Sequence, residues 1–329
     1  MKGLSKVYVS TLFLLGVSCS APKGEYLVNG DTMGTFYTVQ FWPERNATNQ
    51  ILNAEIQRVL NEFEKELSNW RPNSWINQFN AAPVDVPVPV PIHAYSVLKL
   101  SLELAERSDG FLDPTLSPLI NLWGFGVTGK QPVPSQRAID ETLKRVGHNN
   151  LIFDRENKTL TKKHPGVELN CSAVAKGYAV DLVGLSLRKM GIENYLINIG
   201  GEVSAHGNRR DGSNWTVGLL KPSLDGRIKK SGESLALSNL ALATSGQTHR
   251  TIIRDGKRYT HILNPKTGYP VSTNTASVTV VAQNCALADG LATLALLLDD
   301  DPFQVILQSY EDVEVIRMHW AEEGVASTK

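Results

Sequence analysis

The segment that decides the fold runs from Arg258 to Leu298 and contains RYTHILNPKTGYP (258–270) and SVTVVAQNCALADGLATLALLL (277–298). It predicts a strand, a turn, a second strand and then a helix that is apolar apart from Asp289 and Thr293. Residues at i and i+4 share a helix face, and a buried ionised carboxylate needs a partner or a cation. The pair therefore indicates either a magnesium site, since hard cations prefer oxygen ligands, or a buried aspartate beside a threonine that bonds back to a helix carbonyl.

His261 lies between the first predicted strand and the turn. The dipeptides Asn264-Pro265 and Thr267-Gly268 that follow it are typical of a rigid turn. A histidine held there can act as a general base near neutral pH. A single histidine is also a common structural residue, so this residue alone leaves its role open.

The rest of the chain mixes helices and strands without a regular βαβ alternation, which predicts an α+β fold, strand-rich, with helices packed on the sheets. Apolar spacing predicts helices at 49–67, 96–107, 135–146, 173–190 and 303–308. Predicted strands lie at 26–41 (two strands, broken at Gly30 and Gly34), 151–154, 195–199, 215–219, 236–243, 250–254, 277–281 and 313–318. The proline-rich run 82–91 is predicted to be an extended linker.

The N-terminus is different in kind from the remainder. Lys2 and Lys6 precede an apolar run at 7–17, too short to cross a bilayer and typical of a signal peptide. The sequence LGVSC resembles a bacterial lipobox, which makes Cys19 the candidate lipidated residue; secretion with plain cleavage is the alternative. We therefore expect a lipoprotein signal peptide at 1–18, a tether at 19–27, a single domain at 28–320 and a tail at 321–329.

Charge and cysteine content exclude several classes. The chain has 33 basic and 33 acidic residues and no basic stripe, which argues against nucleic acid as a partner. It has three cysteines and no CxxC motif, so zinc and iron–sulfur sites are not expected. A disulfide between Cys171 and Cys285 is compatible with an exported protein but not required by the spacing.

Two motifs combine small residues with a charged one. NCSAVAKGYAVD (170–181) opens a helix with Lys176 in its first turns, where free amides and the helix dipole favour an anion such as phosphate. NIGGE (198–202) is a strand that runs into two glycines, after which Glu202 could accept hydrogen bonds from a ligand. A solvated lysine and a tight hairpin are the simpler interpretations.

The order of the motifs is more specific than any single motif. MGTFYTV (33–39), DGFLDPTLSPLINLWGFG (109–126), AVAKGYAVD, NIGGE, ATSG (243–246), THILNPKTGYP and ADGLAT (288–293) together closely resemble the ApbE family, from about residue 28 to about residue 317. Its members are lipoprotein-type, magnesium-dependent FAD:protein FMN transferases. The resemblance implies a periplasm-facing enzyme of the bacterial cell envelope, lipid-anchored to a membrane, the inner membrane being favoured.

The resemblance also implies a reaction and its partners. FMN would pass from FAD to the hydroxyl of a threonine, or sometimes a serine, in an acceptor protein. A phosphoester would form and AMP would be released. The expected acceptors are flavin-bearing subunits of Nqr and Rnf redox complexes or related FMN-binding domains.

By motif position, the resemblance assigns roles to nine residues. Magnesium would be held by the backbone oxygen of Ala175 and the side chains of Asp289 and Thr293. His261 would take the proton of the incoming hydroxyl. The residues implied for FAD are Met33, Asp109, Asp113, Lys176 and Glu202.

Three positions depart from the family pattern. Asn170 stands where an aspartate is usual, Trp75 follows Ser74 where a glutamate is common, and Asn264 stands where an aspartate is frequent. These changes put in doubt an acidic contribution before the 173–190 helix and alter the expected edge of the flavin pocket.

Two other functions remain open from the sequence. One is a magnesium-dependent FAD pyrophosphatase that yields FMN and AMP, with water in place of the acceptor hydroxyl. The other is a non-catalytic FAD-binding lipoprotein, although storage of FAD does not need His261, Lys176, Asp289 and Thr293 together.

Overall fold

The computed structural model describes residues 26–42, 49–222, 228–247, 251–254 and 257–320. The predicted signal peptide, Cys19 and the tail at 321–329 lie outside these residues, as does most of the predicted tether. The first strand begins at Tyr26, so the last two residues of that tether belong to the sheet. Among the described helices, none combines the length and the apolar character that a membrane crossing requires.

The described elements mix helices and strands, as predicted. The helices are α1 (Asn49–Leu67), α2 (Trp75–Ala81), α3 (Ile92–Arg107), α4 (Ser117–Leu122), α5 (Gln136–Leu143), α6 (Ser172–Lys189), α7 (Cys285–Leu297), α8 (Asp300–Leu307) and the 3-10 turn η1 (His148–Asn150). The strands are β1 (Tyr26–Thr32), β2 (Thr35–Phe41), β3 (Val88–Pro89), β4 (Leu151–Asp154), β5 (Thr159–Lys162), β6 (Tyr195–Ile199), β7 (Glu202–His206), β8 (Trp215–Pro222), β9 (Ile228–Leu237), β10 (Leu240–Gly246), β11 (Thr251–Arg254), β12 (Lys257–Thr260), β13 (Thr275–Ala282) and β14 (Glu314–His319).

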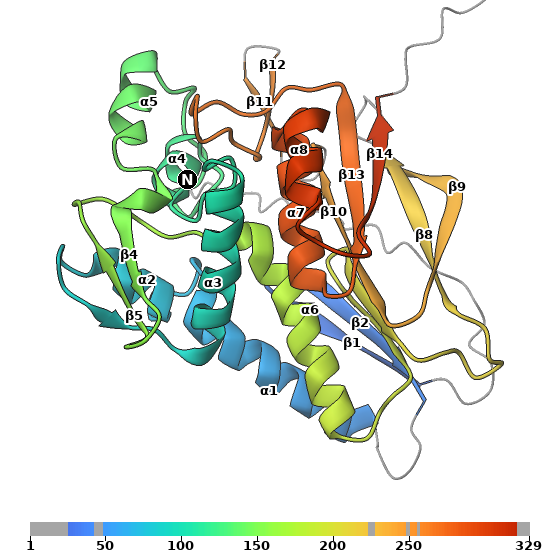
Figure 1. Cartoon of the computed structure of the whole chain (residues 1–329). Coiled ribbons are helices and arrows are strands. Elements are labelled where there is room, and N and C mark those ends of the chain that lie inside the picture. Colours follow the sequence, from blue (N-terminus) through green and yellow to red (C-terminus); the bar gives the residue numbers. More distant parts are fainter. Residues whose placement is uncertain (1–25, 43–48, 223–227, 248–250, 255–256, 321–329) are drawn as a thin grey trace, which may run out of the picture.

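A seven-stranded sheet in the order β1-β2-β6-β7-β10-β13-β14 organises the molecule, and every neighbouring pair in it is antiparallel. Helices α1, α6 and α7 pack on one face, as Figure 1 shows. Because side chains alternate along a strand, β7 directs Glu202 to the helices and Val203 and Ala205 to the other face. There they pack with Trp215 and Leu237 of the β8–β9 ribbon. The centre of the sheet is thus covered on both sides.

The two central helices approach each other closely at a glycine. A Cβ atom on Gly177 of α6 would lie 2.2 Å from the carbonyl oxygen of Cys285 at the start of α7. No other residue type fits there without moving one helix. The apolar sequence of α7 is explained by this packing, since it is covered by α6 on one side and by β10 and β13 on another.

Two breaks between strands differ from the prediction. The segment 236–243, predicted as one strand, is divided between β9 and β10, because Asn239 adopts the left-handed conformation with φ 56°. Gly30, predicted to break a strand, lies within β1 and is covered by the ring of Tyr37, 2.6 Å from where a Cβ would stand. The break falls at Met33-Gly34, where both residues have positive φ.

Some elements were not predicted. The helices α2 and α4 have seven and six residues, too few for apolar periodicity to be evident. Val88–Pro89 forms a short strand that pairs with β5, inside the segment predicted as a linker. The α3 helix begins at Ile92, four residues before its predicted start.

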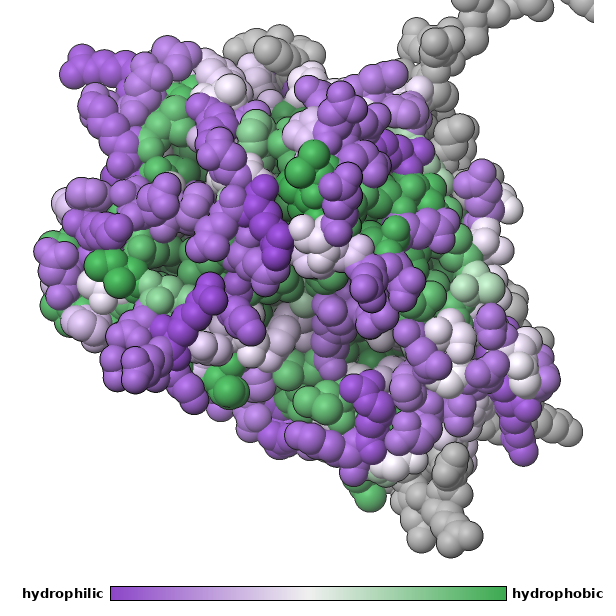
Figure 2. Space-filling view, in the orientation of Figure 1, coloured by the Kyte–Doolittle hydropathy of each residue, from purple (hydrophilic) through white to green (hydrophobic). Residues whose placement is uncertain are grey.

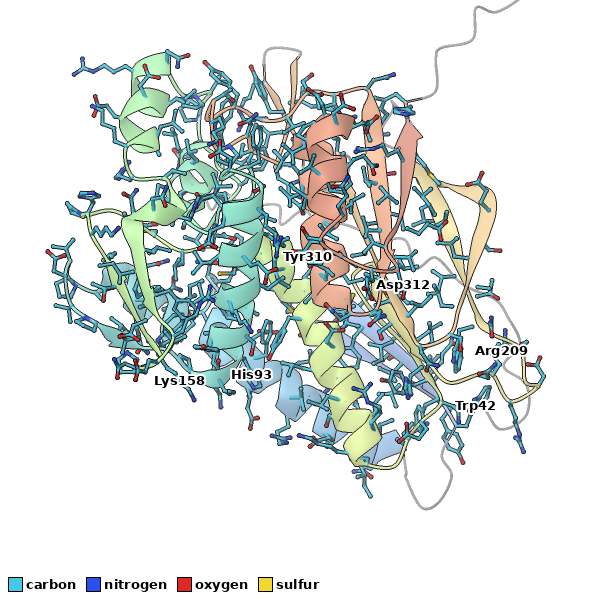
Figure 3. All side chains as sticks on the ribbon, in the orientation of Figure 1. Trp42, His93, Lys158, Arg209, Tyr310 and Asp312 are labelled. Carbon is cyan, nitrogen blue, oxygen red and sulfur yellow. The ribbon has the colours of Figure 1, made fainter. Side chains whose placement is uncertain are left out.

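The C-terminal elements are fastened to the helices by side chains. Tyr310, which follows α8, donates a hydrogen bond to Glu103 of α3 (3.3 Å), and Arg107 lies over its ring at 5.6 Å (Figure 3). On the other side of the sheet Trp42 stacks on Trp215 with ring centroids 5.5 Å apart. Figure 2 shows a mainly hydrophilic surface over the helices, with hydrophobic residues visible between polar ones around α8 and the neighbouring strands.

Replacing Gly177 with alanine tests the close helix contact. In an exposed helix this change is favourable by about 1 kcal/mol. Here we expect it to destabilise the protein by about 1–3 kcal/mol, because the added methyl group meets backbone rather than a flexible side chain. Urea denaturation measures the difference. Gly218→Ala in β8 is the matched control, since no atom lies within 4 Å of the point where its Cβ would stand. Equal stability of Gly177→Ala and wild type would contradict the contact.

Candidate active site

The N-terminal half of α6 and the middle of α7 bring four predicted site residues together. Asp289 on α7 is buried, and its Oδ2 accepts a hydrogen bond from the Gly177 amide of α6 at 2.9 Å. Gly177 is two residues from Ala175 on α6. The segment of α6 that includes the predicted cation ligand Ala175 therefore contacts Asp289, the other predicted ligand, on α7. Thr293 is one turn further along α7, on the same face as Asp289.

Thr293 is held by a strand that the site prediction did not include. Its hydroxyl lies 3.1 Å from the Ser245 hydroxyl of β10 and 3.3 Å from the Asp289 carbonyl oxygen. The second contact is the back-bond to a helix carbonyl expected from the simpler interpretation. Ser245 belongs to the ATSG motif, and its position next to Thr293 explains why that motif accompanies ADGLAT.

Lys176 forms an ion pair with Glu202, which connects α6 to β7. Burial opposes the charge on Lys176, but the Glu202 and Asp289 carboxylates outweigh it and raise the lysine pKa. Burial also raises the pKa of Glu202, although Lys176 acts in the opposite direction. The two glycines before Glu202 form the tight hairpin between β6 and β7, with φ 64° and 115°. The segment 198–202 therefore forms a tight hairpin and also places a charged side chain at the candidate site.

One oxygen of Glu202 has no partner among the described residues. This atom, Oε2, is buried and makes no hydrogen bond to them. Buried carboxylate oxygens are rarely left unpaired, so such an atom points to a missing ligand. This orphaned oxygen fits the implied contact between Glu202 and FAD.

Asp181, which was not singled out as a site residue, binds the beginning of α7. Its two oxygens accept hydrogen bonds from the Cys285 and Ala286 amides, each at 2.9 Å. Burial raises its pKa to about 6, although these amides act in the opposite direction. An acidic residue within a largely apolar helix was the available signal, the same signal that identified Asp289.

The oxygen set at this site fits magnesium. Burial, reinforced by the Glu202 carboxylate, raises the pKa of Asp289 to about 8. The carboxylates of Glu202 and Asp289 thus act on one lysine, and a cation beside Asp289 would relieve the cost of its burial. Ala175, Asp289 and Thr293 would supply only oxygen, which suits magnesium. Within the described residues no three His, Cys, Asp or Glu side chains form a metal cluster, and this set contains only one of them.

Met33 lies at the tip of the β1–β2 hairpin and is fixed by α1. Its φ is 50°, a left-handed conformation that is uncommon for a residue with a side chain. Glu64 holds the turn, because its Oε1 accepts hydrogen bonds from the Met33 amide (2.9 Å) and the Thr32 hydroxyl (2.8 Å). Arg71 forms an ion pair with the other oxygen of Glu64 at 2.5 Å. The amphipathic pattern of α1 did not indicate this role for Glu64.

The two aspartates of the 109–113 turn have different surroundings. Asp109 is exposed and forms an ion pair with Lys266 at 3.0 Å. Asp113 is buried and accepts hydrogen bonds from the amides of Thr115 and His148 at 2.8 and 2.7 Å. Its hydrogen bond to the His148 ring, and then its charge, raise the histidine pKa against the effect of burial. Asp113 therefore shapes the turn, and its predicted contact with FAD stays a prediction.

His261 follows β12 and enters a hairpin-like loop. Backbone hydrogen bonds from Asn264 to Tyr269 and from Val271 to Ile262, both 2.8 Å, close this loop. The His261 ring lies edge-on to Phe125, with centroids 6.4 Å apart. Trp123, in the 109–126 motif, is buried and donates a hydrogen bond to the Gly268 carbonyl at 2.8 Å. Its role here is packing.

The 109–115 turn connects the His261 loop to the segment before α6 through one side-chain ion pair and one backbone hydrogen bond. Lys266 of the loop reaches Asp109, and the Pro114 carbonyl accepts a hydrogen bond from the Asn170 amide at 2.7 Å. The Asn170 side chain accepts from the Ser172 amide at 3.0 Å, so it caps the approach to α6 without a charge. The other departures are also structural: Asn264 accepts from the Lys266 amide, and Trp75 donates to the Pro89 carbonyl, both at 2.8 Å.

Comparison with known proteins decides the family. A sequence profile of the ApbE family matches residues 33–317. The chain belongs to the ApbE family. An FAD:protein FMN transferase of Vibrio cholerae serotype O1 is 35% identical over 320 residues, covering 97% of this chain and 94% of its own. One of Haemophilus influenzae is 32% identical over 307 residues, covering 91% and 88%.

Solved ApbE structures share the fold. The flavin transferase ApbE of Vibrio cholerae superposes with a TM-score of 0.81 and 33% identity, covering 91% of this chain and 94% of that one. The apo form of the Pseudomonas stutzeri flavinyl transferase ApbE gives 0.80 and 31%, covering 91% and 92%. The predicted α+β architecture and the ApbE resemblance are thereby confirmed. Cys171 and Cys285 are both free and buried, so no disulfide joins them.

The raised carboxyl pKa values predict how stability varies with pH in the absence of metal. The pKa values of Asp181 and Asp289, about 6 and about 8, lie above the unperturbed value of 3.8. The stability contributed by their neutral forms is complete below that value and is lost as pH rises through about 6 and then about 8. We expect the melting temperature in chelator to fall from about pH 4 to about pH 8, most steeply below about pH 6, where both groups contribute.

Asp289→Asn isolates the Asp289 part of this change, because its amide oxygen can still accept from Gly177. Its melting temperature should fall less than that of wild type between about pH 4 and about pH 8, whereas the other titrating groups are common to both proteins. Identical pH dependence in the two proteins would contradict the raised pKa of Asp289.

Proposed function

We propose that the protein is a magnesium-dependent FAD:protein FMN transferase that modifies a threonine or serine of an acceptor protein. The protein is a transferase, in keeping with its family. The observation that carries the proposal is the meeting of Lys176, Glu202, Asp289 and Thr293 where α6, α7 and β7 converge, in a chain of the ApbE family.

The reaction exchanges one phosphorus–oxygen bond for another. The acceptor hydroxyl oxygen bonds to the FMN phosphorus of FAD, the pyrophosphate bond at that phosphorus breaks, and AMP leaves. His261 takes the proton of the acceptor hydroxyl, because a hydroxyl is a weak nucleophile until a base removes its proton. Lys176 lies in the first turns of α6, where its charge stabilises the negative charge that develops on the phosphate oxygens.

Magnesium would be held by the Ala175 carbonyl, Asp289 and Thr293, and when bound it supplies positive charge to the pyrophosphate. The protein's own contribution is to place Asp289 and Thr293 on one face of α7, to bring that helix against α6, which carries Ala175, and to exclude water from Asp289. Glu202 keeps Lys176 oriented, and its unpaired oxygen remains for a donor group of FAD. The turns at Met33 and Asp109–Asp113 would line the rest of the FAD site.

The proposed setting is the periplasmic side of a bacterial membrane, with Cys19 carrying the lipid anchor. The proposed acceptors are FMN-bearing subunits of Nqr- or Rnf-type complexes or related domains. The lipobox-like sequence before Cys19 and the ApbE motifs support this setting.

Intact-mass spectrometry of an acceptor domain tests the activity. The domain is incubated with this protein, FAD and magnesium, and a parallel sample contains EDTA. We expect a mass gain of one FMN that is absent with EDTA. Free FMN and AMP without any mass gain would favour the pyrophosphatase, and unchanged FAD would favour a flavin-binding protein.

Replacement of Asp289 with alanine tests the metal ligand. The variant should fold, since removing a buried carboxylate also removes its desolvation cost, but magnesium-dependent transfer should be lost. Circular dichroism checks folding, and calorimetric titration with magnesium alone checks binding. Full transfer activity in Asp289→Ala would eliminate this assignment.

Replacement of His261 with alanine tests the base. We expect transfer to slow by a factor of about 10²–10⁴, while FAD affinity stays close to that of wild type. Single-turnover assays measure transfer and flavin fluorescence measures binding. His148→Ala is a control histidine on the neighbouring turn. Unaltered turnover of His261→Ala would make this histidine structural.

A further inference from the structure

The beginning of α7 depends on a side chain from another helix. Cys285 and Ala286 donate their amides to Asp181 of α6, each at 2.9 Å. Asn284 provides the acceptors for the next two amides: its side chain binds Leu287 (2.9 Å) and its carbonyl binds Ala288 (3.2 Å). The amides of Cys285, Ala286 and Leu287, which a helix start leaves without internal partners, are thus all bound by side chains, two of them by the neighbouring helix.

A further hydrogen bond between the two helices has its donor on α6 and its acceptor on α7. Asp289 of α7 accepts from the Gly177 amide of α6 at 2.9 Å. Gly177 and Asp181 are i and i+4 on α6, and Cys285 and Asp289 are i and i+4 on α7. Each helix therefore presents one aspartate to the other, together with backbone donors: one amide from α6 and two from α7. Between them, the missing side chain of Gly177 allows the helices to touch.

We propose that Asp181 is a positioning residue that fixes the first turn of α7 against α6 and thereby sets the position of Asp289, one turn later, for magnesium. The proposal rests on the proposed function, because it assumes that Asp289 binds the metal. Magnesium requires near-octahedral oxygen ligands at about 2.1 Å, so a small displacement of α7 weakens binding. The Asp181 charge also lies at the positive end of α7, where the helix dipole favours it.

Two substitutions of Asp181 separate position from charge. Asp181→Asn keeps the size of the side chain but loses its charge. One carboxylate oxygen is replaced by an NH₂ group, a donor that would face the amide of Cys285 or Ala286. Asp181→Glu keeps the charge but is one methylene longer, so it does not reproduce the paired hydrogen bonds. If Asp181 acts by position, both variants should raise the magnesium dissociation constant by about 10-fold or more. If only charge matters, Asp181→Glu should bind as wild type does.

Three readouts are measured on the full folded domain. Calorimetric titration with magnesium alone gives the dissociation constant, and hydrogen–deuterium exchange reports the amides of 285–290. Transfer assays at low and saturating magnesium complete the set. We expect faster exchange in the first turn of α7 and a loss of transfer that is larger at low magnesium.

Asn284→Ala is the matched control. It removes an exposed cap from the same helix end but leaves the connection to α6, so its magnesium affinity should stay within about twofold of wild type. An equal loss in Asn284→Ala would overturn the proposal, because general fraying of α7 would then explain the effect.

The remaining outcomes are separable. Unchanged exchange at 285–290 in Asp181→Asn, or wild-type magnesium affinity in either Asp181 variant, contradicts the positioning role. If Asp181→Glu does not fold, the isosteric Asp181→Asn decides by its exchange pattern, since lost charge alone weakens binding without loosening α7. Wild-type protein that binds no magnesium contradicts the proposed metal site, whereas the exchange comparison still reports on the helix contact.

Discussion

The contact between α6 and α7 at Gly177 is the constraint on which the candidate site depends. Because Gly177 has no side chain, the two helices approach until backbone meets backbone, and Asp289 reaches the Gly177 amide. The same approach places Lys176 over the sheet, where it meets Glu202 of β7. The large antiparallel sheet supports both helices and is itself covered from behind by β8 and β9, so the helices rest on a surface that is packed on both faces.

The charges at this contact are unbalanced within the described residues. Two buried carboxylates, Glu202 and Asp289, act on one lysine, Lys176, and the raised pKa values of both carboxyl groups follow from burial. A protein that needed only stability would have little reason to retain such a set, since taking carboxylates out of water is costly even when each has a partner. Carboxyl groups with pKa values perturbed in this way are typical of functional sites, and here they fit the proposed cation site.

Much of this could be predicted from particular residues. The 19 residues of α1 carry enough apolar periodicity to locate both ends, and Asp289 was conspicuous because its helix is otherwise apolar. The division at Asn239 could not be predicted, since one left-handed residue leaves no trace in an apolar pattern. Asp113 is a residue type that often contacts ligands, yet its oxygens accept hydrogen bonds from Thr115 and His148. The sequence does not distinguish an aspartate that binds a ligand from one that holds a turn. Asp181 and Ser245 gain their roles only from tertiary neighbours.

The Met33 turn, which we propose lines the FAD site, would affect the thermodynamics of flavin recognition. Glu64 holds the left-handed backbone of Met33 in place. Asp113 holds the turn at Thr115 and the turn at His148, and all these contacts are made within the protein. These loops are therefore ordered before a ligand arrives. Binding at such a surface loses little conformational entropy of the protein, so a modest number of polar contacts is enough for useful affinity. The resulting rigidity also favours discrimination by shape, since a poorly matched ring finds no flexible loop that can adapt to it.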